Sequence, residues 1–584
     1  MLRRLVRWIV RAALAVTVLI IAARVVDYFG RRIPAGSVLL VKLDGPVVER
    51  GGGPLSDLVG TNETPLNLVR RAIDKAKDDP RIVGLALKVI DPQLEFAQAQ
   101  ELCSLISGLA RRGKWSAAYL ESAGEGAPGN LPYLVASCAD EVSLMPQGEL
   151  NLIGVRLQEM FARGMLERLK IEPEFDAIGR YKSAANVFTQ TDFTAAQREE
   201  DDAVVGSLFG QLVGKVAERR RLAPDSVKAI IDRAPLLAAD GLKLKLVDRV
   251  EYEDQFDKRI KHYRQSEHYL ADYRDYARAG VRLLPDHRDR IAVVYASGVI
   301  ERGRGGIDPL FSADTPAMGS DRIVEAFREV RRDDSVRAVV FRIDSPGGSV
   351  IASELIRRAV ELTARKKPVV ASLSGYGASG GYWVAAPARR IFAEAGTLTG
   401  SIGVLGGKFN LARTAGAVGV NTGAATRGAN VMMYDPFSAF TPAQQQLFHD
   451  QILGDTYRHF IALVARHTHL SPAEVDQVAQ GRVWTGSEAL KRRLIDGLGG
   501  LDAAIEEARK LAKVPAGRPV RIVEMPERPG IVEQLLAGGL VQATAGASAA
   551  AEARLRPLLA ILRTARLAAG GEDGLVYCPV RPAM

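Results

Sequence analysis

Cysteine is scarce in this chain of 584 residues, which contains only Cys103, Cys138 and Cys578. Their spacing matches no zinc or iron–sulfur pattern, and three thiols cannot build the disulfide framework of a small secreted domain. We therefore expect buried or incidental thiols. We also expect no metal site and no other cofactor.

Histidine is also rare, with seven in the chain. They are His262, His268, His287, His449, His459, His467 and His469. The first three fall in a polar stretch near the middle of the chain, and none of the seven belongs to a glycine-rich turn. A Ser-His-Asp triad therefore has little support.

Concentrated basic charge is missing too. The formal net charge of +10 is spread along the chain, without long basic blocks and without aromatic residues interleaved among them. Scattered charge of this kind is typical of a solvated surface. We do not expect a nucleic-acid partner.

Long apolar runs are absent except at the N-terminus. There, four arginines precede an uncharged run over residues 12–23. The 19 residues from 8 to 26 would span about 28 Å as a helix if Arg11 and Arg24 extend toward the lipid headgroups. The arginine excess before the run favours a cytoplasmic N-terminus. We expect residues 1–32 to anchor the chain in the inner membrane, with the rest on the extracytoplasmic side.

A cleavable signal peptide is the alternative for this segment, because a run of about 12 apolar residues also suits its central region. No clean Ala-x-Ala cleavage site follows the run. An uncleaved transmembrane helix is therefore favoured.

A repeat of whole-domain size runs through the chain. Segments of the first half return in the same order about 250 residues later, a period far longer than that of a solenoid. The matched pairs are 47–51 with 299–303, 152–155 with 401–404, 194–197 with 441–444, and 246–248 with 494–496. The chain is also long enough for two cores, since single cores stop growing near about 250–300 residues. An internal duplication into two tandem domains is predicted.

The repeat divides the chain into five parts. We expect the anchor over residues 1–32, a first repeat over 33–254, a connector over 255–290, a second repeat over 291–515 and a tail over 516–584. The sequence assigns no role to the tail.

Each repeat has the pattern of an α/β fold. Residues 338–343 are a β-branched run, 344–349 a turn, 351–366 a helical stretch and 368–373 a second strand. Such units predict parallel strands with right-handed crossovers. Functional residues on this scaffold belong at the carboxyl ends of the strands, where the glycine turns lie.

The turn that contains Gly347 and Gly348 is a candidate oxyanion hole. Without a Cβ atom, glycine lets backbone N–H groups approach a substrate closely. A plain tight turn is the more common explanation of such a motif. However, the equivalent segment of the first repeat, residues 91–94, has lost both glycines.

The two repeats complement each other at two further positions. Ser379, which precedes two glycines in the second repeat, aligns with Asn130 in the first. Lys182 of the first repeat aligns with Thr426 of the second. A nucleophilic serine needs a base, and lysine can serve where burial favours its neutral form. The simpler interpretations are a helix-capping serine and a solvated surface lysine.

Four motifs then carry a resemblance to a known family. They are Asp344-Ser345-Pro346-Gly347-Gly348, Ala378-Ser379-Gly380-Gly381-Tyr382-Trp383, Leu398-Thr399-Gly400-Ser401-Ile402-Gly403 and Tyr181-Lys182-Ser183-Ala184. With them, the chain resembles the long form of the signal peptide peptidase A family, the membrane-anchored serine proteases of peptidase family S49. This family belongs to the Clp protease/crotonase superfamily, so the resemblance implies two tandem domains of that α/β fold.

The resemblance also implies roles for five residues. Ser379 would be the nucleophile, Lys182 the general base, Ser401 the hydroxyl that orients the lysine, and Gly347 and Gly380 the donors of the oxyanion hole. The implied substrates are cleaved signal peptides and other short unfolded peptides, hydrolysed through an acyl-enzyme without metal or cofactor. The implied assembly is a homotetramer with its active sites facing inward.

Two other functions stay open from the sequence. One is a crotonase-like acyl-CoA enzyme, in which the glycine N–H groups would hold a thioester enolate. The other is a non-catalytic membrane scaffold. Neither explains why the two repeats together retain one complete set of site residues.

Overall fold

The structure, a computed structural model, describes residues 33–51, 63–279, 289–305, 317–515, 517–527 and 575–577. The transmembrane anchor expected over residues 1–32 lies outside these described residues. Within them, no helix combines the length and the apolar character needed to cross a bilayer.

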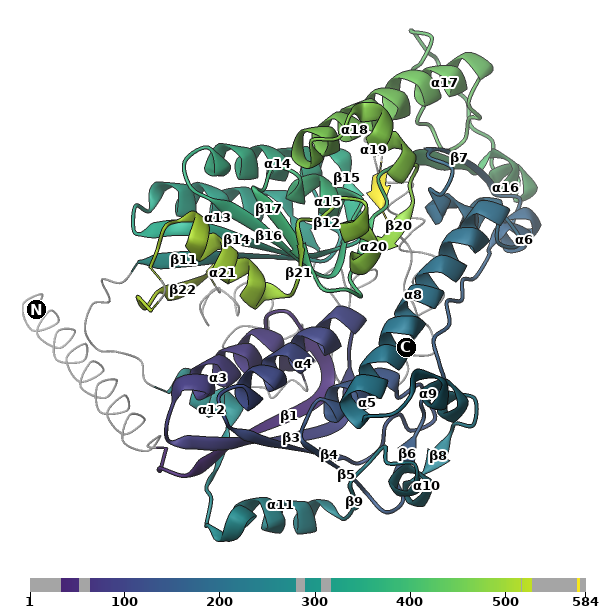
Figure 1. Ribbon diagram of the computed structural model, residues 1–584. Helices are drawn as coiled ribbons and strands as arrows, with labels where there is room; N and C mark the ends of the chain where they lie inside the picture. Colours follow the sequence, from purple (N-terminus) through teal and green to yellow (C-terminus); the bar gives the residue numbers. More distant parts are fainter. Residues whose placement is uncertain are drawn as a thin grey trace, which may run out of the picture.

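The first half of the chain forms a parallel sheet with the strand order β10-β1-β3-β4-β5-β9 (Figure 1). The strands are β1 (Ser37–Val48), β3 (Ile82–Gln93), β4 (Trp115–Leu120), β5 (Glu141–Leu144), β9 (Arg249–Val250) and β10 (Leu270–Asp272), with β2 (Thr64–Pro65) beside β1. The helices of this half are α3 (Leu66–Asp78), α4 (Phe96–Ala110), α5 (Asn130–Ser137), α6 (Arg163–Arg168), α7 (Asn186–Thr189), α8 (Ala195–Arg220), α9 (Pro224–Ile231), α10 (Ala238–Lys243), α11 (Glu253–Lys261) and α12 (Tyr273–Arg278).

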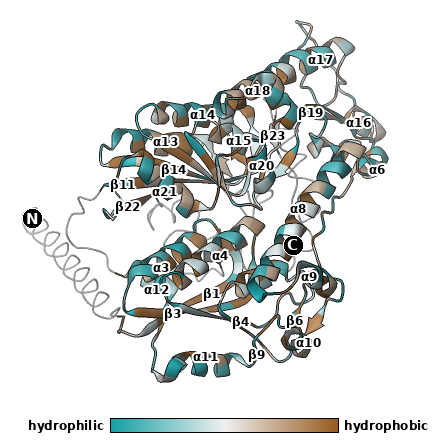
Figure 2. Ribbon diagram, viewed as in Figure 1, coloured by the Kyte–Doolittle hydropathy of each residue, from teal (hydrophilic) through white to brown (hydrophobic). Residues whose placement is uncertain are grey.

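Helices cover both faces of this sheet because its strands are apolar on both sides. Alternate side chains of a strand point to opposite faces. Leu39 and Val41 of β1 therefore pack with α3, α4 and α12, whereas Val38 packs with α11 on the other face. Figure 2 shows the sheet strands as largely hydrophobic ribbons.

The second half repeats this architecture with the strand order β22-β11-β14-β16-β18-β20. The strands are β11 (Arg290–Ser297), β14 (Val336–Ser345), β16 (Val369–Ala378), β17 (Arg390–Ala393), β18 (Leu398–Gly400), β20 (Val483–Thr485), β21 (Gly497–Leu498) and β22 (Arg521–Met525). The helices are α13 (Ser320–Arg332), α14 (Val350–Ala364), α15 (Gly380–Ala385), α16 (Ala412–Ala417), α17 (Pro442–Leu447), α18 (Gly454–Thr468), α19 (Pro472–Val478), α20 (Gly486–Lys491) and α21 (Leu501–Leu511). The predicted α/β class with parallel sheets is confirmed.

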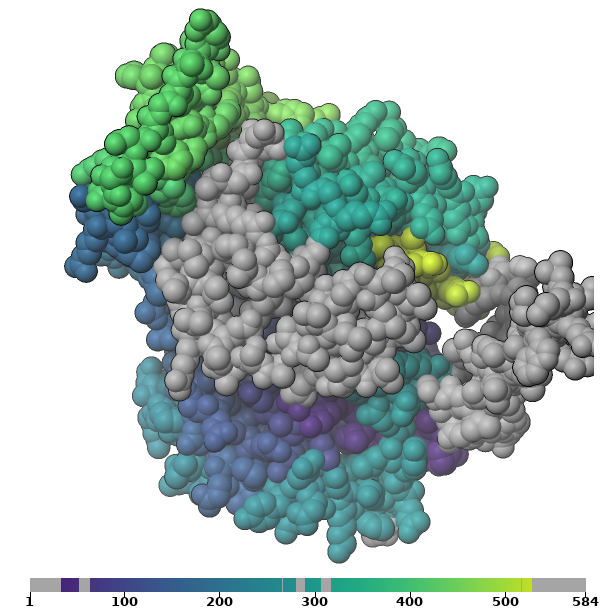
Figure 3. All heavy atoms as spheres, turned by 180° about the vertical axis from the view of Figure 1, so that it is seen from behind, coloured from purple at the N-terminus to yellow at the C-terminus, as the bar shows by residue number. Residues whose placement is uncertain are grey.

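A third sheet joins the two halves, with the order β13-β12-β15-β23-β19-β7. Its strands are β12 (Ile300–Glu301), β13 (Met318–Gly319), β15 (Gly347–Ser349), β19 (Val404–Asn410), β23 (Leu575–Tyr577) and β7 (Glu172–Ile178). Strand β7 comes from the first half and pairs antiparallel with β19 of the second, from Ile178 opposite Val404 to Glu172 opposite Asn410. Seen from behind, blue first-half residues lie directly against green residues of the second half (Figure 3).

A buried ion cluster fixes the halves at a second place. The guanidinium of Arg342, on β14, lies 2.7 Å from a carboxylate oxygen of Glu49 and 2.7 Å from one of Glu101. Both carboxylates belong to the first half, and the Arg342 side chain is only 1% exposed. A buried charge requires such partners, because leaving it uncompensated costs several kcal/mol.

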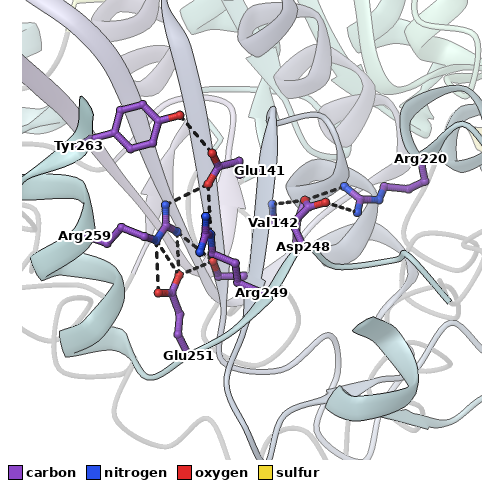
Figure 4. Close-up of polar contacts among 9 residues, drawn as sticks. Glu141, Val142, Arg220, Asp248, Arg249, Glu251, Arg259 and Tyr263 are labelled. Atoms are coloured by element: carbon purple, nitrogen blue, oxygen red, sulfur yellow. Dashed lines mark hydrogen bonds and ion pairs between the residues drawn. The ribbon is translucent and has the colours of Figure 1, made fainter. Parts of the chain in front are cut away.

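Segments outside the two expected repeats also join these sheets. From the expected connector, β10 pairs with β1 and α11 packs on the sheet of the first half. Figure 4 shows the polar contacts that hold α11 there, with Arg259 hydrogen-bonded to Glu141 and Glu251. From the expected tail, β22 pairs with β11.

The expectation of incidental thiols was wrong for two cysteines. Cys103 on α4 and Cys138, which follows α5, form a buried disulfide. The two positions are 35 residues apart in sequence, and packing of α4 against α5 brings their Cα atoms to 5.3 Å. Their spacing gave no hint because the contact is tertiary.

Candidate active site

Lys182 and Ser379 meet at the joint between the halves. The lysine Nζ lies 2.7 Å from the Ser379 Oγ, 3.0 Å from the Ser401 Oγ and 2.9 Å from the Ser401 carbonyl oxygen. All three residues are buried. The structure therefore brings together the lysine and both serines that the sequence singled out.

Ser379 occupies a sharp turn between β16 and α15. Its backbone has φ +56° and ψ −117°, a left-handed conformation that is unusual for a residue other than glycine. Backbone hydrogen bonds hold it there, from its N–H to the Gly400 carbonyl and from the Trp383 N–H to its own carbonyl. A strained strand-to-helix turn also presents the serine hydroxyl at the end of the sheet in α/β-hydrolases.

Lys182 lies beside Ser379 because it follows β7, the first-half strand that pairs with β19 of the second half. The loop after β7 turns at Gly179, and the Tyr181 N–H donates to the Gln480 carbonyl of the second half at 2.8 Å. Gly481 lies so close that a Cβ atom on it would be 2.6 Å from the backbone nitrogen of Lys182. The lysine backbone is thus seated directly on the second half.

The glycines expected at the oxyanion hole adjoin Ser379. Gly347 and Gly348 have φ +109° and +154°, and a Cβ atom on Gly348 would lie 2.1 Å from the Ile300 carbonyl oxygen. Gly380 begins α15, and a Cβ atom there would lie 3.1 Å from the Gly347 Cα. Gly348 is needed because a side chain there would clash with the backbone of Ile300, and Gly380 lets the start of α15 approach the turn closely.

An extended strand lies across this edge of the site. Strand β23, residues 575–577 of the chain itself, pairs antiparallel with β15, with Tyr577 opposite Gly347 and Leu575 opposite Ser349 (Figure 2). Its other edge pairs antiparallel with β19, with Leu575 opposite Leu405. The backbone edges of β15 and β19 therefore accept an extended peptide strand between them.

The equivalent place in the first half holds an asparagine in place of the serine. Asn130 is fully buried there, and its side-chain amide donates to the Gly154 carbonyl at 2.8 Å while its Oδ1 accepts from the Gly154 N–H at 3.3 Å. Thr426, which aligns with Lys182, is exposed on a loop. The structure thus assembles one Ser–Lys pair from two copies.

The residues that hold the Lys182 loop in place were not predicted from the sequence. Segment 480–483 of the second half lies between Lys182 and Ser401, and Glu200 on α8 accepts a hydrogen bond from the Val483 N–H. Burial raises the pKa of Glu200 to about 8. No motif or matched repeat segment covers residues 480–483, so the sequence carried no signal for them.

Comparisons with known proteins agree with this geometry. The model of peptidase family S49 matches residues 120–266 and 361–515, one segment in each half. The chain is similar to Protease 4 of Salmonella typhi, at 33% identity over 515 residues that cover 82% of this chain and 79% of that protein. It is also similar to Serine protease SPPA, chloroplastic, of Arabidopsis thaliana, at 29% identity over 520 residues that cover 88% and 74% of the two chains. Protease 4 of Haemophilus influenzae is 30% identical over 511 residues, 81% of this chain and 78% of the relative.

Proposed function

Since this chain belongs to peptidase family S49 and is a serine protease, we propose that Ser379 is its nucleophile and Lys182 its general base. The observation that carries the proposal is the 2.7 Å contact between the Lys182 Nζ and the Ser379 Oγ in a buried site. Ser401 is the orienting hydroxyl, because its Oγ and its carbonyl oxygen both hydrogen-bond to the Lys182 amine. A non-catalytic scaffold would have no need of this arrangement.

The proposed reaction proceeds through an acyl-enzyme. Neutral Lys182 accepts the Ser379 proton while the Oγ attacks the peptide carbonyl, and the Gly347 and Gly380 N–H groups stabilise the oxyanion. The protonated lysine then gives its proton to the leaving amine as the C–N bond breaks. Water, activated by the same lysine, hydrolyses the ester and restores Ser379.

For substrates, we propose cleaved signal peptides and other short unfolded peptides. A peptide that pairs with the edges of β15 and β19 beside the buried serine must be extended, and β23 shows the pairing that such a strand adopts. A folded domain cannot present its backbone in this way.

We also propose that the chain is anchored by residues 1–32 in the inner membrane, acts on the extracytoplasmic side and assembles as a homotetramer. The Cys103–Cys138 disulfide supports the location, because disulfides persist in oxidising compartments and are rare in the cytosol.

The test compares wild type, Ser379→Ala and Ser137→Ala for hydrolysis of a defined signal peptide and for labelling by a fluorophosphonate. Ser137 is a matched control, because it is equally buried and its hydroxyl donates to the Leu134 carbonyl of its own helix. Ser379→Ala should lower turnover on the order of 1,000-fold or more and abolish labelling. Equal activity in wild type and Ser379→Ala would overturn the proposal.

A further inference from the structure

We infer that Glu200 is a positioning residue of the active site: it holds segment 480–483 against Lys182 and, by its own charge, adjusts how readily Lys182 accepts a proton. This inference rests on the proposed roles of Lys182 and Ser379. Glu200 touches neither the nucleophile nor the expected position of the substrate, so it acts through its neighbours.

The first step is the bridging position of segment 480–483. On one side, the Gln480 carbonyl accepts a hydrogen bond at 2.8 Å from the N–H of Tyr181, the residue before Lys182. On the other side, the Gly481 N–H donates to the Ile402 carbonyl at 2.8 Å, and the Arg482 carbonyl accepts from the Ser401 N–H at 2.7 Å. Displacement of this segment would therefore move the lysine and its orienting serine at once.

The second step is the clamp that α8 places on the segment. One carboxyl oxygen of Glu200 accepts the Val483 N–H. The preceding residue, Glu199, accepts from Arg482 at 2.8 Å and from the Tyr181 hydroxyl at 2.9 Å. Adjacent residues of one helix thus hold both the segment and the residue before the base.

The third step is the isolation of the Glu200 carboxyl. The residue is 1% exposed, and its second oxygen is buried without a hydrogen-bond partner among the described residues. A carboxyl that served only to accept one backbone N–H would be replaceable by an amide or a hydroxyl. An ionisable group in this place instead couples its charge to the site.

The charge of Glu200 affects the protonation of Lys182 in one direction. Burial raises the pKa of Glu200 to about 8, the neighbouring Asp201 raises it further, and the charges of Arg482 and Lys182 oppose the rise. Near neutral pH the carboxyl is therefore mostly uncharged. As pH rises through about 8, it ionises, and a negative charge near the lysine favours the protonated amine, which cannot act as base. The rise of activity with pH should be retarded by Glu200.

The decisive variant is Glu200→Gln, which keeps an acceptor for the Val483 N–H and removes the charge. We expect the midpoint of the kcat/KM pH profile to move down by roughly half a pH unit, with about a threefold gain in neutral lysine above pH 8, where the wild-type Glu200 carboxyl is ionised. Glu394→Gln is the matched control. Glu394 is a buried carboxyl with its pKa raised to about 8, it lies in the second half, and its charged neighbours are Glu101, Arg342 and Asp502.

A second variant tests the clamp. Glu200→Asp keeps the charge but shortens the reach to Val483, so kcat should fall roughly tenfold while the midpoint stays in place. An unmoved midpoint in Glu200→Gln, or a moved midpoint in Glu200→Asp, would overturn the inference. Either result leaves the proposed function standing as long as turnover and fluorophosphonate labelling still depend on Ser379. Loss of that dependence in wild type would instead overturn the proposed function.

Discussion

The two halves share one architecture but differ at the strand-to-helix turn where chemistry is expected. In the second half this turn holds Ser379 in a strained conformation, beside glycines and a lysine. In the first half the same turn holds Asn130, whose amide is satisfied at both ends by Gly154. The asparagine replaces a reactive group with a locked structural contact. The first half thus lacks a nucleophile at this turn and contributes Lys182 to the site of the second half instead.

The same contrast extends to the neighbouring strand. In the second half the strand is interrupted after Ser345, and β15 restarts at Gly347 with its left-handed glycines. In the first half β3 runs on without interruption to Gln93, paired with β1. The first-half segment therefore has neither the break nor the left-handed glycines of the second-half turn. The loss of glycine and the loss of serine belong together.

The largest effect is expected when the contribution of the first half to the chemistry is removed. Lys182→Arg should be as inactive as Lys182→Ala, with kcat/KM reduced about 1,000-fold or more, because a guanidinium stays protonated and cannot accept the serine proton. Steady-state hydrolysis of a signal peptide measures both variants. Activity of Lys182→Arg above about a tenth of wild type would mean that the lysine is only a structural cation.

The difference between the halves also predicts that the second half cannot supply its own base. Thr426→Lys in a Lys182→Ala background should restore no activity, because Thr426 lies on an exposed loop. The same hydrolysis assay measures the rescue, and the Lys182→Ala parent is the control. Recovery of a substantial fraction of the wild-type rate would show that the second half can host a complete pair by itself.

The joint between the halves predicts the next effect. Arg342→Leu should lower the free energy of unfolding by about 3–5 kcal/mol, because Glu49 and Glu101 would be left buried without their cation. Arg390→Leu is the control, since Arg390 is 53% exposed and pairs with Asp496, so its loss should change stability by less than about 1 kcal/mol. Urea unfolding measures both. Equal shifts in the two variants would mean that the buried cluster does not hold the halves together.

The smallest effect concerns the strand-to-helix turn of the first half, which contains Asn130. Asn130→Ser should cost about 1–3 kcal/mol of stability, because the Gly154 N–H and carbonyl lose their partners. It should create no second active site. Hydrolysis by Asn130→Ser in a Ser379→Ala background should therefore stay at the level of Ser379→Ala alone. Measurable turnover would show that the first half still retains a latent oxyanion hole and base.

The sequence was sufficient for the α/β class and for the residues that meet at the site. Ser379 and Lys182 lie in segments that recur, so comparing the copies exposed what each had kept, whereas Ser401 followed from the resemblance to the family. The parallel strands followed from apolar runs and crossover lengths, although β16 extends five residues past the predicted end, to Ala378. These features are encoded locally, within a few residues of each motif.

Contacts between distant segments outside the four motifs could not be predicted. The Cys103–Cys138 disulfide depends on how α4 packs against α5, and Glu200 meets Val483 across 283 residues of chain. The cluster of Arg342 with Glu49 and Glu101 likewise depends on the docking of one half on the other. No short motif marks such partners, because each is defined only after both segments have folded.

The pairing of β7 with β19 has a consequence for the order in which the protein is made. Synthesis delivers the lysine first, the serine about 200 residues later, and the segment that seats them together only after residue 480. A chain still growing on the ribosome therefore has no complete active site through most of its translation. The site is completed only after both halves have been synthesised.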